Sequence, residues 1–154
     1  VGVGGKVCVF THAETHLIVD VNGAFPAGAS FAPLVPARLW DSRPGESTSD
    51  GVGAGGGRVA AGSVVEVLVA GRGGVDAGAG AVVLNVTAVL PSGPGHLTVF
   101  PCGGAVPSTS NVNYLPGQVV PNSVVSKVGV GGKVCVFTHA ETHLIVDVNG
   151  AFPS

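Results

Sequence analysis

The chain has 154 residues, of which 10% are charged, and its formal net charge is −2. Nucleic acids and anionic membranes bind clusters of Lys and Arg, and because the sequence contains no such cluster, neither is expected as a partner. Apolar residues make up 45% of the chain, but Gly and Pro interrupt every apolar run before it reaches the roughly 18 residues of a membrane span, so a soluble protein is predicted.

The first 26 residues return at the end of the chain without one substitution. The sequence VGVGGKVCVFTHAETHLIVDVNGAFP occupies both 1–26 and 128–153. Repeats normally drift, since a surface substitution usually costs within about 0.5 kcal/mol, and identity therefore indicates a recent duplication or a piece of a near-identical tandem array. The period, 127 residues, is the size of a small domain. We predict one complete repeat domain at 27–153, preceded at 1–26 by the tail of the previous repeat.

Residues 40–43, Trp-Asp-Ser-Arg, form the densest cluster of binding groups in the sequence. A sugar ring could stack on Trp40 while Asp41 and Arg43 hydrogen-bond its hydroxyl groups, and Tyr114 could complete such a site. In the structural alternative, Asp41 and Arg43 lie on one side of a strand and pair with each other, while Trp40 anchors the core. Tyr114 also has a structural alternative, with one edge buried and its hydroxyl in water.

Short β-branched segments separated by Gly and Pro follow a predicted exposed Gly-rich loop at 46–57. Residues 81–90 alternate apolar and polar side chains with period two, and the turn at 91–95 predicts a hairpin with the strand at 96–100. A second predicted hairpin joins the strands at 133–138 and 144–148. Further strands are predicted at 63–70, 110–115, 118–120 and 122–127.

No segment has a dozen residues with apolar positions at helical spacing free of Gly and Pro, so little or no helix is expected. About eight short antiparallel strands, spaced 8–12 residues apart, predict an all-β sandwich or jelly roll. A β-trefoil-like barrel is the alternative.

Each 127-residue period contains two cysteines, Cys102 and Cys135, because Cys8 is the duplicate of Cys135. An even number per period predicts a disulfide between them, with Cys8 as the alternative partner of Cys102; two buried free thiols in a reducing compartment are the other interpretation. Few charges, three Lys among many Gly and Pro, and no Met favour an extracellular protein, secreted or at the cell surface.

Metal binding and catalysis are not expected. His139 and His143 would share a face on a helix, but strands flank them, so with Asp147 they are weak candidates and fall short of the four ligands of a structural zinc site. Asp147 lies in an apolar strand and, if buried, needs a partner such as Arg38 or Arg43. The sequence has no nucleophile elbow, metalloprotease motif or phosphate loop, so we predict no enzyme and no cofactor.

Four stretches carry a resemblance to a known family: PARLWDSRPG at 36–45, VLNVTAVLPSGPGHLTVFPCG at 83–103, SNVNYLPGQVVPNSVV at 110–125 and KVCVFTHAETHLIVDVNGAFP at 133–153. Together they resemble a β-rich tandem repeat module of secreted and cell-surface actinobacterial proteins. The resemblance implies an extracellular accessory or structural module without catalytic activity, found in tandem or appended to extracellular hydrolases. The family's Leu-Asp-Thr-Arg appears here as Leu39-Trp40-Asp41-Ser42-Arg43, and its Gly-Tyr-Phe as Gly150-Ala151-Phe152.

The duplication also predicts assembly. Residues 27–127 offer one complementary surface for two identical segments, so one segment is left over. The first copy can hang loose, replace the second copy in a permuted fold, or pair with a neighbouring molecule by strand exchange, head to tail. We therefore expect a non-catalytic structural or adhesive repeat of a surface or fibre-forming protein, whose partners are copies of the same repeat. The alternative from a different class is a carbohydrate-binding module for cell-wall polysaccharide.

Overall fold

A computed structural model describes residues 2–17, 19, 24–26 and 28–154. Within them, helical structure is confined to two three-residue 3-10 turns, η1 (Val3–Gly5) and η2 (Val130–Gly132). No helix in this part of the chain is long and apolar enough to cross a membrane. The strands are β1 (Ala32–Asp41), β2 (Val64–Leu68), β3 (Ala79–Val89), β4 (Gly95–Pro101), β5 (Val112–Tyr114), β6 (Val119–Lys127), β7 (Lys133–Thr138) and β8 (His143–Pro153).

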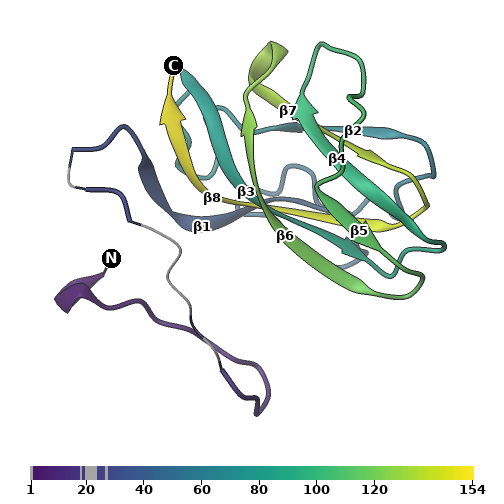
Figure 1. Cartoon of the computed structure of the whole chain (residues 1–154), viewed down its shortest axis with the longest axis horizontal. Coiled ribbons are helices and arrows are strands. Elements are labelled where there is room, and N and C mark those ends of the chain that lie inside the picture. Colours follow the sequence, from purple (N-terminus) through teal and green to yellow (C-terminus); the bar gives the residue numbers. More distant parts are fainter. Residues whose placement is uncertain (1, 18, 20–23, 27) are drawn as a thin grey trace.

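The strands form two antiparallel sheets that pack face to face (Figure 1). The first sheet has the strand order β1-β8-β3-β6, and the second has the order β2-β7-β4-β5. This arrangement confirms the predicted all-β sandwich of about eight strands. The β-trefoil-like barrel is excluded, because both sheets are open and end in edge strands.

Alternation along each strand builds the core. In β3, the side chains of Val82, Leu84 and Val86 are fully buried between the sheets, whereas the intervening residues lie on the outer face. The same period places Val134 and Val136 of β7 in the core from the opposite sheet. The remaining large, fully buried side chains belong to Leu39, Val67, Val69, Leu97, Leu144, Val146 and Val148.

Both predicted hairpins are wrong as pairings, although their strands exist. β3 lies in the first sheet and β4 in the second, and β7 and β8 are divided between the sheets in the same way. Each connection therefore crosses from one layer to the other. The physical reason is that a short turn reverses the chain between two layers as readily as within one sheet, so that turn residues alone do not specify the partner strand.

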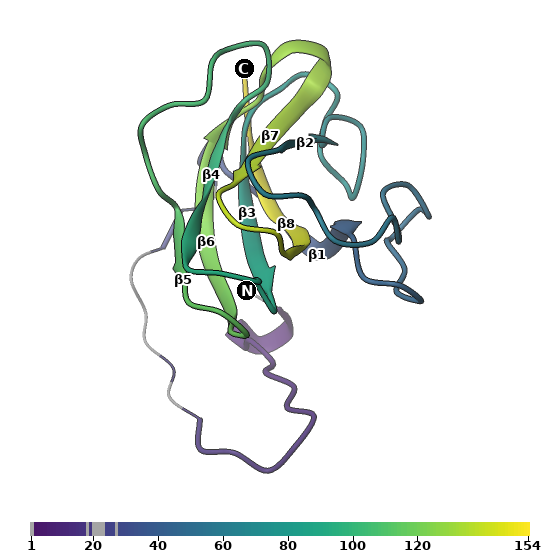
Figure 2. The same cartoon turned by 90° about the vertical axis from the view of Figure 1, so that its right-hand side faces the viewer.

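The second copy of the duplicated segment supplies β7 and β8, which occupy interior positions of both sheets. β8 lies between β1 and β3, and β7 lies between β2 and β4. The described residues of the first copy make no strand; Figure 2 shows 2–17 outside the sandwich. The predicted tail at 1–26 falls partly outside the described residues. In this structure, 128–153 completes the fold.

A disulfide joins Cys102, just after β4, to Cys135 in β7, with the two Cα atoms 5.0 Å apart. Both cysteines are buried with Phe100 in a small cluster against which Phe137 packs. Cys8 is an exposed free thiol. The predicted pairing is therefore present, and a buried disulfide indicates an oxidising, extracellular environment.

Candidate functional site

A row of polar side chains crosses the outer face of the first sheet. In the strand register, Arg38 of β1 is opposite Asp147 of β8, Asp147 is opposite Asn85 of β3, and Asn85 is opposite Ser123 of β6. These four residues are far apart in the sequence, and sheet pairing alone brings them into one line. Cross-strand neighbours on one face have Cβ atoms about 5 Å apart, so such a row acts as a single surface.

Arginines link the carboxylates at the β1 end of this row. The Nε of Arg38 donates to Asp147 at 2.8 Å and its Nη1 donates to Asp41 at 2.9 Å. Asp41, which is fully buried, also accepts from the Nε and Nη2 of Arg43 at 3.0 and 2.7 Å. Glu46 lies 3.7 Å from Arg43 at the end of the chain of ion pairs. Asp41 and Arg43 therefore pair as the structural interpretation predicts, and Arg38 joins them to Asp147.

The ion pairs favour the charged forms of Asp41, Arg38 and Arg43. Burial pushes the pKa of Asp41 upward, but hydrogen bonds from the side chain and backbone of Arg43, with the charges of Arg43 and Arg38, outweigh it and bring the pKa below its usual value. The hydrogen bond to Asp147 raises the pKa of Arg38, and the bond to Asp41 raises that of Arg43. Asp41, Arg38 and Arg43 therefore form a fixed group of charges at the β1 end of the row.

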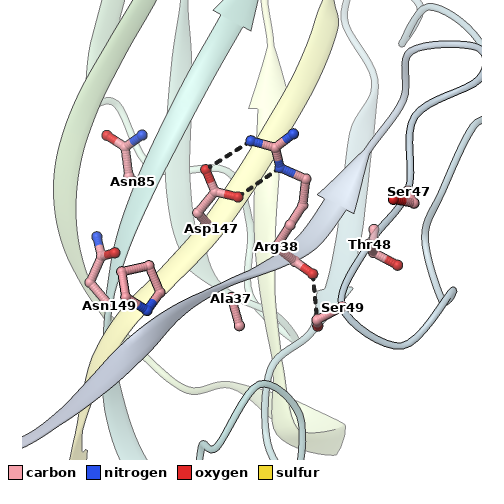
Figure 3. A pocket seen from close by; sticks show the side chains of 9 residues that line it. Ala37, Arg38, Ser47, Thr48, Ser49, Asn85, Asp147 and Asn149 are labelled. Carbon is pink, nitrogen blue, oxygen red and sulfur yellow. Dashed lines mark hydrogen bonds and ion pairs between the residues drawn. The ribbon is translucent and has the colours of Figure 1, made fainter. Parts of the chain in front are cut away.

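An open groove of about 640 Å³ lies over this row, and Figure 3 shows the side chains that line it. Arg38 and Asp147 meet at its centre, Asn85 and Asn149 lie on one side, and the segment 47–49 forms the other wall. Among the described residues, no hydrogen bond uses the side-chain amide of Asn85 or Asn149. Because an amide carries both donors and acceptors, the groove offers unused partners for a polar ligand.

The wall of the groove is part of the Gly-rich loop, and Arg72 holds that loop in place. This guanidinium is buried, pairs with Asp50 through two bonds of 2.7 Å, and donates to the backbone oxygens of Leu39, Val52 and Leu68. These bonds hold the pKa of Asp50 well below its usual range, led by the side-chain hydrogen bond from Arg72. The loop is exposed, as its composition predicts, but it is anchored at several points.

Trp40 and Tyr114 do not join a common ligand site. Trp40 lies in β1 of the first sheet, and its ring packs so closely under Gly53 that a Cβ at Gly53 would lie 2.7 Å from it. Tyr114 lies in β5 of the second sheet and is buried, and its hydroxyl contacts that of Thr138 at 2.9 Å. The structure therefore does not bring Tyr114 together with Trp40, Asp41 and Arg43 in the predicted sugar site, because Tyr114 belongs to the other sheet. The sequence alone does not indicate which strands share a sheet.

The two histidines, His139 and His143, contact different groups and do not form a pair. His139 is exposed and stacks on His96 with ring centroids 5.4 Å apart. His143 instead contacts the hydroxyl of Ser42 through Nδ1 at 3.2 Å. The carboxylate of Asp147, the third candidate ligand, forms an ion pair with Arg38. Among the residues that the structure describes, no group of three or more His, Cys, Asp or Glu side chains is arranged to hold a metal ion.

No family model, no curated protein and no solved structure matches this chain. Neither Asn85 nor Asn149 is predicted from the sequence as a groove residue. Asn85 begins the triplet Asn85-Val86-Thr87, which matches a glycosylation sequon, and both are polar residues at outward positions of apolar strands. Their convergence depends on the order of strands in the sheet, which periodicity does not specify.

Proposed function

We propose that this chain is a non-catalytic structural repeat of an extracellular tandem array, and that its molecules associate by strand exchange. In the proposed assembly, the first copy of the duplicated segment in one molecule takes the place of β7 and β8 in another. The observation that supports this proposal is that the first copy has the same sequence as two interior strands, whereas those of its residues that the structure describes form no strand. The disulfide agrees with an extracellular location.

The first copy has every side chain that the acceptor surface requires. Val9 is the counterpart of Val136, which is buried between the sheets, and Cys8 is the counterpart of Cys135. In the described residues of the first copy these apolar groups face solvent. A molecule whose second copy is displaced therefore presents a slot that the first copy of a neighbour fits residue for residue.

Exchange gains no new contacts, because the exchanged strands make the native ones. The fraction of exchanged molecules depends on two concentrations: that of the protein, and the effective concentration at which a molecule's own segment competes for the slot. The effective concentration is in the millimolar range for short flexible connections. An array that crowds many repeats together meets this condition. Dilute single chains should remain monomers.

The test is oxidative refolding of the reduced, denatured chain at about 1 mM and at about 1 μM, chosen around that effective concentration. We expect oligomers joined by Cys8–Cys102 disulfides between chains at the high concentration and monomers with Cys102–Cys135 at the low one. Light scattering gives the mass, and peptide mapping gives the pairing. Monomers at both concentrations, with Cys8 free, would overturn the proposal.

Two variants distinguish exchange from unspecific association. Val9→Asp places a charge at a position whose counterpart, Val136, is buried, so the first copy should no longer fill a slot and oligomers should disappear. Val3→Asp is the matched control, because Val3 and its counterpart Val130 are both exposed. It should associate like the parent chain.

A second candidate function is polysaccharide binding in the groove over Arg38 and Asp147. The observation that favours it is the pair of unused amides, Asn85 and Asn149, beside a fixed guanidinium–carboxylate pair, since sugar hydroxyls need donors and acceptors held in place. Tandem copies would raise the avidity for a repetitive polymer. Both candidates fit one repeat, because the first copy has the same residues at the positions of Asp147 and Asn149, so that an exchanged strand would supply the same groove side chains.

Titration calorimetry with soluble fragments of cell-wall polysaccharide tests this candidate. Binding should be lost in Asn85→Ala and Asn149→Ala and retained in Asn113→Ala, which alters an exposed amide on the other sheet. Trp40→Ala is not the deciding variant, because the indole is packed under the loop. Absence of binding to every cell-wall fraction tried would reject the candidate.

A further inference from the structure

The chain reaches and leaves the sandwich at the same end. β1 is the first strand, β8 is the last, and they are antiparallel neighbours in one sheet, with Ala32 opposite Ala151 and Pro33 opposite Gly150 (Figure 1). The start of β1 and the finish of β8 are therefore side by side. Both connections of the sandwich therefore lie at one end, which we call the junction end.

Three phenylalanines meet at the junction end. Phe31, just before β1, lies 5.1 Å from Phe152 of β8 between ring centroids. Phe25, at the end of the first copy, stacks on Phe31 at 4.4 Å with the planes 30° apart and lies 6.1 Å from Phe152. A side chain at Gly150 would overlap the Phe31 ring, so glycine is what lets this ring lie across β8.

Phe25 is the counterpart of Phe152 in the preceding copy of the repeat. If the chain is part of a tandem array, as the proposed function holds, Phe25 belongs to the end of strand β8 in the previous repeat. We propose that Phe31 and Phe152 form a contact surface between repeats, and that its occupant is the end of β8 from the preceding repeat. Each junction then gathers Phe31 and Phe152 from both repeats into one aromatic cluster.

This contact limits how an array extends. Six residue steps separate Pro26 from Ala32, and a fully extended chain spans at most about 3.3–3.6 Å per residue, so neighbouring junction ends lie within about 20 Å. β8 itself, with 11 residues, is longer than this, at about 3.4 Å per residue. Successive sandwiches therefore project sideways from a short aromatic spine and do not follow one another end to end.

The contact is testable in the intact 154-residue chain by NMR. We expect cross-peaks between the ring protons of Phe25 and Phe31, and backbone order parameters above about 0.6 for residues 24–26. Phe31→Ala should lower those order parameters below about 0.6, whereas Phe10→Ala, which removes another exposed ring of the first copy, should not change them. Residues 24–26 that are as mobile as 2–17 in the parent chain would overturn the proposal.

Phe25→Ala provides a second measurement that does not depend on a correctly packed Phe31 variant. It leaves every strand intact and should shift the ring resonances of Phe31 and Phe152, while resonances of the core remain unchanged. Unchanged resonances at both rings would contradict the contact. The readout is separate from that of strand exchange: monomers at all concentrations with the ring contacts present would reject exchange and keep the junction, and oligomers without these contacts would do the reverse.

Discussion

The same 26 residues occur twice in this chain, and their two structures differ in an instructive way. The turns are identical: Val3–Gly5 and Val130–Gly132 are both 3-10 turns, and Gly4 and Gly131 have φ angles of 68° and 69°. Even the closing hydrogen bonds agree, at 2.9 Å for Gly2 to Lys6 and 2.8 Å for Gly129 to Lys133. This local structure is therefore encoded by local sequence, in which glycines occupy the left-handed region.

The strands that follow the turns are not shared. Val134 is fully buried in β7, whereas its counterpart Val7 is 76% exposed, and Leu144 is 2% exposed in β8, whereas Leu17 is 57% exposed. The residues are the same, so intrinsic β-propensity is the same. What differs is the presence of neighbouring strands and an opposing layer, which is why β-propensity depends on context more than helix propensity does.

The largest expected effect comes from removing both copies. A chain of residues 27–127 lacks β7 and β8, the strands that join β1 to β3 and β2 to β4, and should not fold. A chain of residues 1–127 should fold as a circular permutant, because it contains one whole period and β1 starts beside the end of β8. Circular dichroism, thermal unfolding and mapping of a Cys8–Cys102 disulfide would check both chains.

The outcome that would break the comparison is an unfolded 1–127 chain beside a folded 27–153 chain. It would mean that the connection from β6 into β7 is required and that the two copies are not interchangeable. A Cys8–Cys102 disulfide in a cooperatively folded 1–127 chain would establish that the first copy can form both interior strands when the second copy is absent.

The next effect contrasts one substitution in the two copies. Leu144→Ala should lower the free energy of unfolding by about 2–5 kcal/mol, because it leaves a cavity in the core. Leu17→Ala should change it by less than about 0.5 kcal/mol, because the side chain is exposed. Urea denaturation measures both. A small loss for Leu144→Ala accompanied by a Cys8–Cys102 disulfide would show that the first copy had replaced the damaged one.

A smaller contrast concerns the cysteines. Cys135→Ser opens the link to Cys102 and should cost about 2–4 kcal/mol, as expected for a loop of this size. Cys8→Ser should leave the stability of the monomer unchanged, because Cys8 is a free, exposed thiol. Both variants are compared with the parent chain under non-reducing conditions. Equal losses in the two variants would show that Cys8 takes part in the folded state.

The sequence predicts most strands but not how they pair. Alternation in 81–90 and 133–138 identifies β3 and β7, and the cysteine count gives the disulfide, because these signals are local or arithmetic. Both hairpins are wrong because a turn sequence such as Pro91–Gly95 reverses the chain equally well within a sheet or between two sheets. Strand β1 begins at Ala32, well before the cluster at 40–43. The sequence does not identify this first part as a strand, because Pro33 and Arg38 interrupt the alternation of apolar and polar residues.

The site shows the same limit. The pairing of Asp41 with Arg43 is predicted from their separation by two residues, but not by the predicted geometry: β1 ends at Asp41, and Arg43 donates to it from the following bend with both its backbone N–H and its side chain. The role of Arg38 as the link to Asp147 depends on the register between β1 and β8, and anchoring of the loop by Arg72 depends on contacts with Asp50 and the backbone of β1 and β2. Long-range register of this kind has no local signature, so the groove could not be located before the fold was known.

The smallest expected effect concerns the ion pairs of Asp41 at the end of β1, next to the Arg38–Asp147 pair that joins β1 to β8 of the second copy. Because Arg43 and Arg38 hold the pKa of Asp41 below its unfolded value, near 4, the ionised carboxylate stabilises the fold above that pH, and the contribution is lost as the pH falls through the lower, folded-state pKa. Asp41→Asn should cost about 1–3 kcal/mol at pH 7 and should flatten the decline in stability below pH 4. Unfolding in urea from pH 7 to pH 2 measures this, with Asp76→Asn, an exposed carboxylate without an ion pair among the described residues, as the control. An unchanged acid profile in Asp41→Asn would show that the ionised carboxylate of Asp41 does not stabilise the fold, and that the Arg38–Asp147 pair and the strand pairing hold β1 to β8 without it.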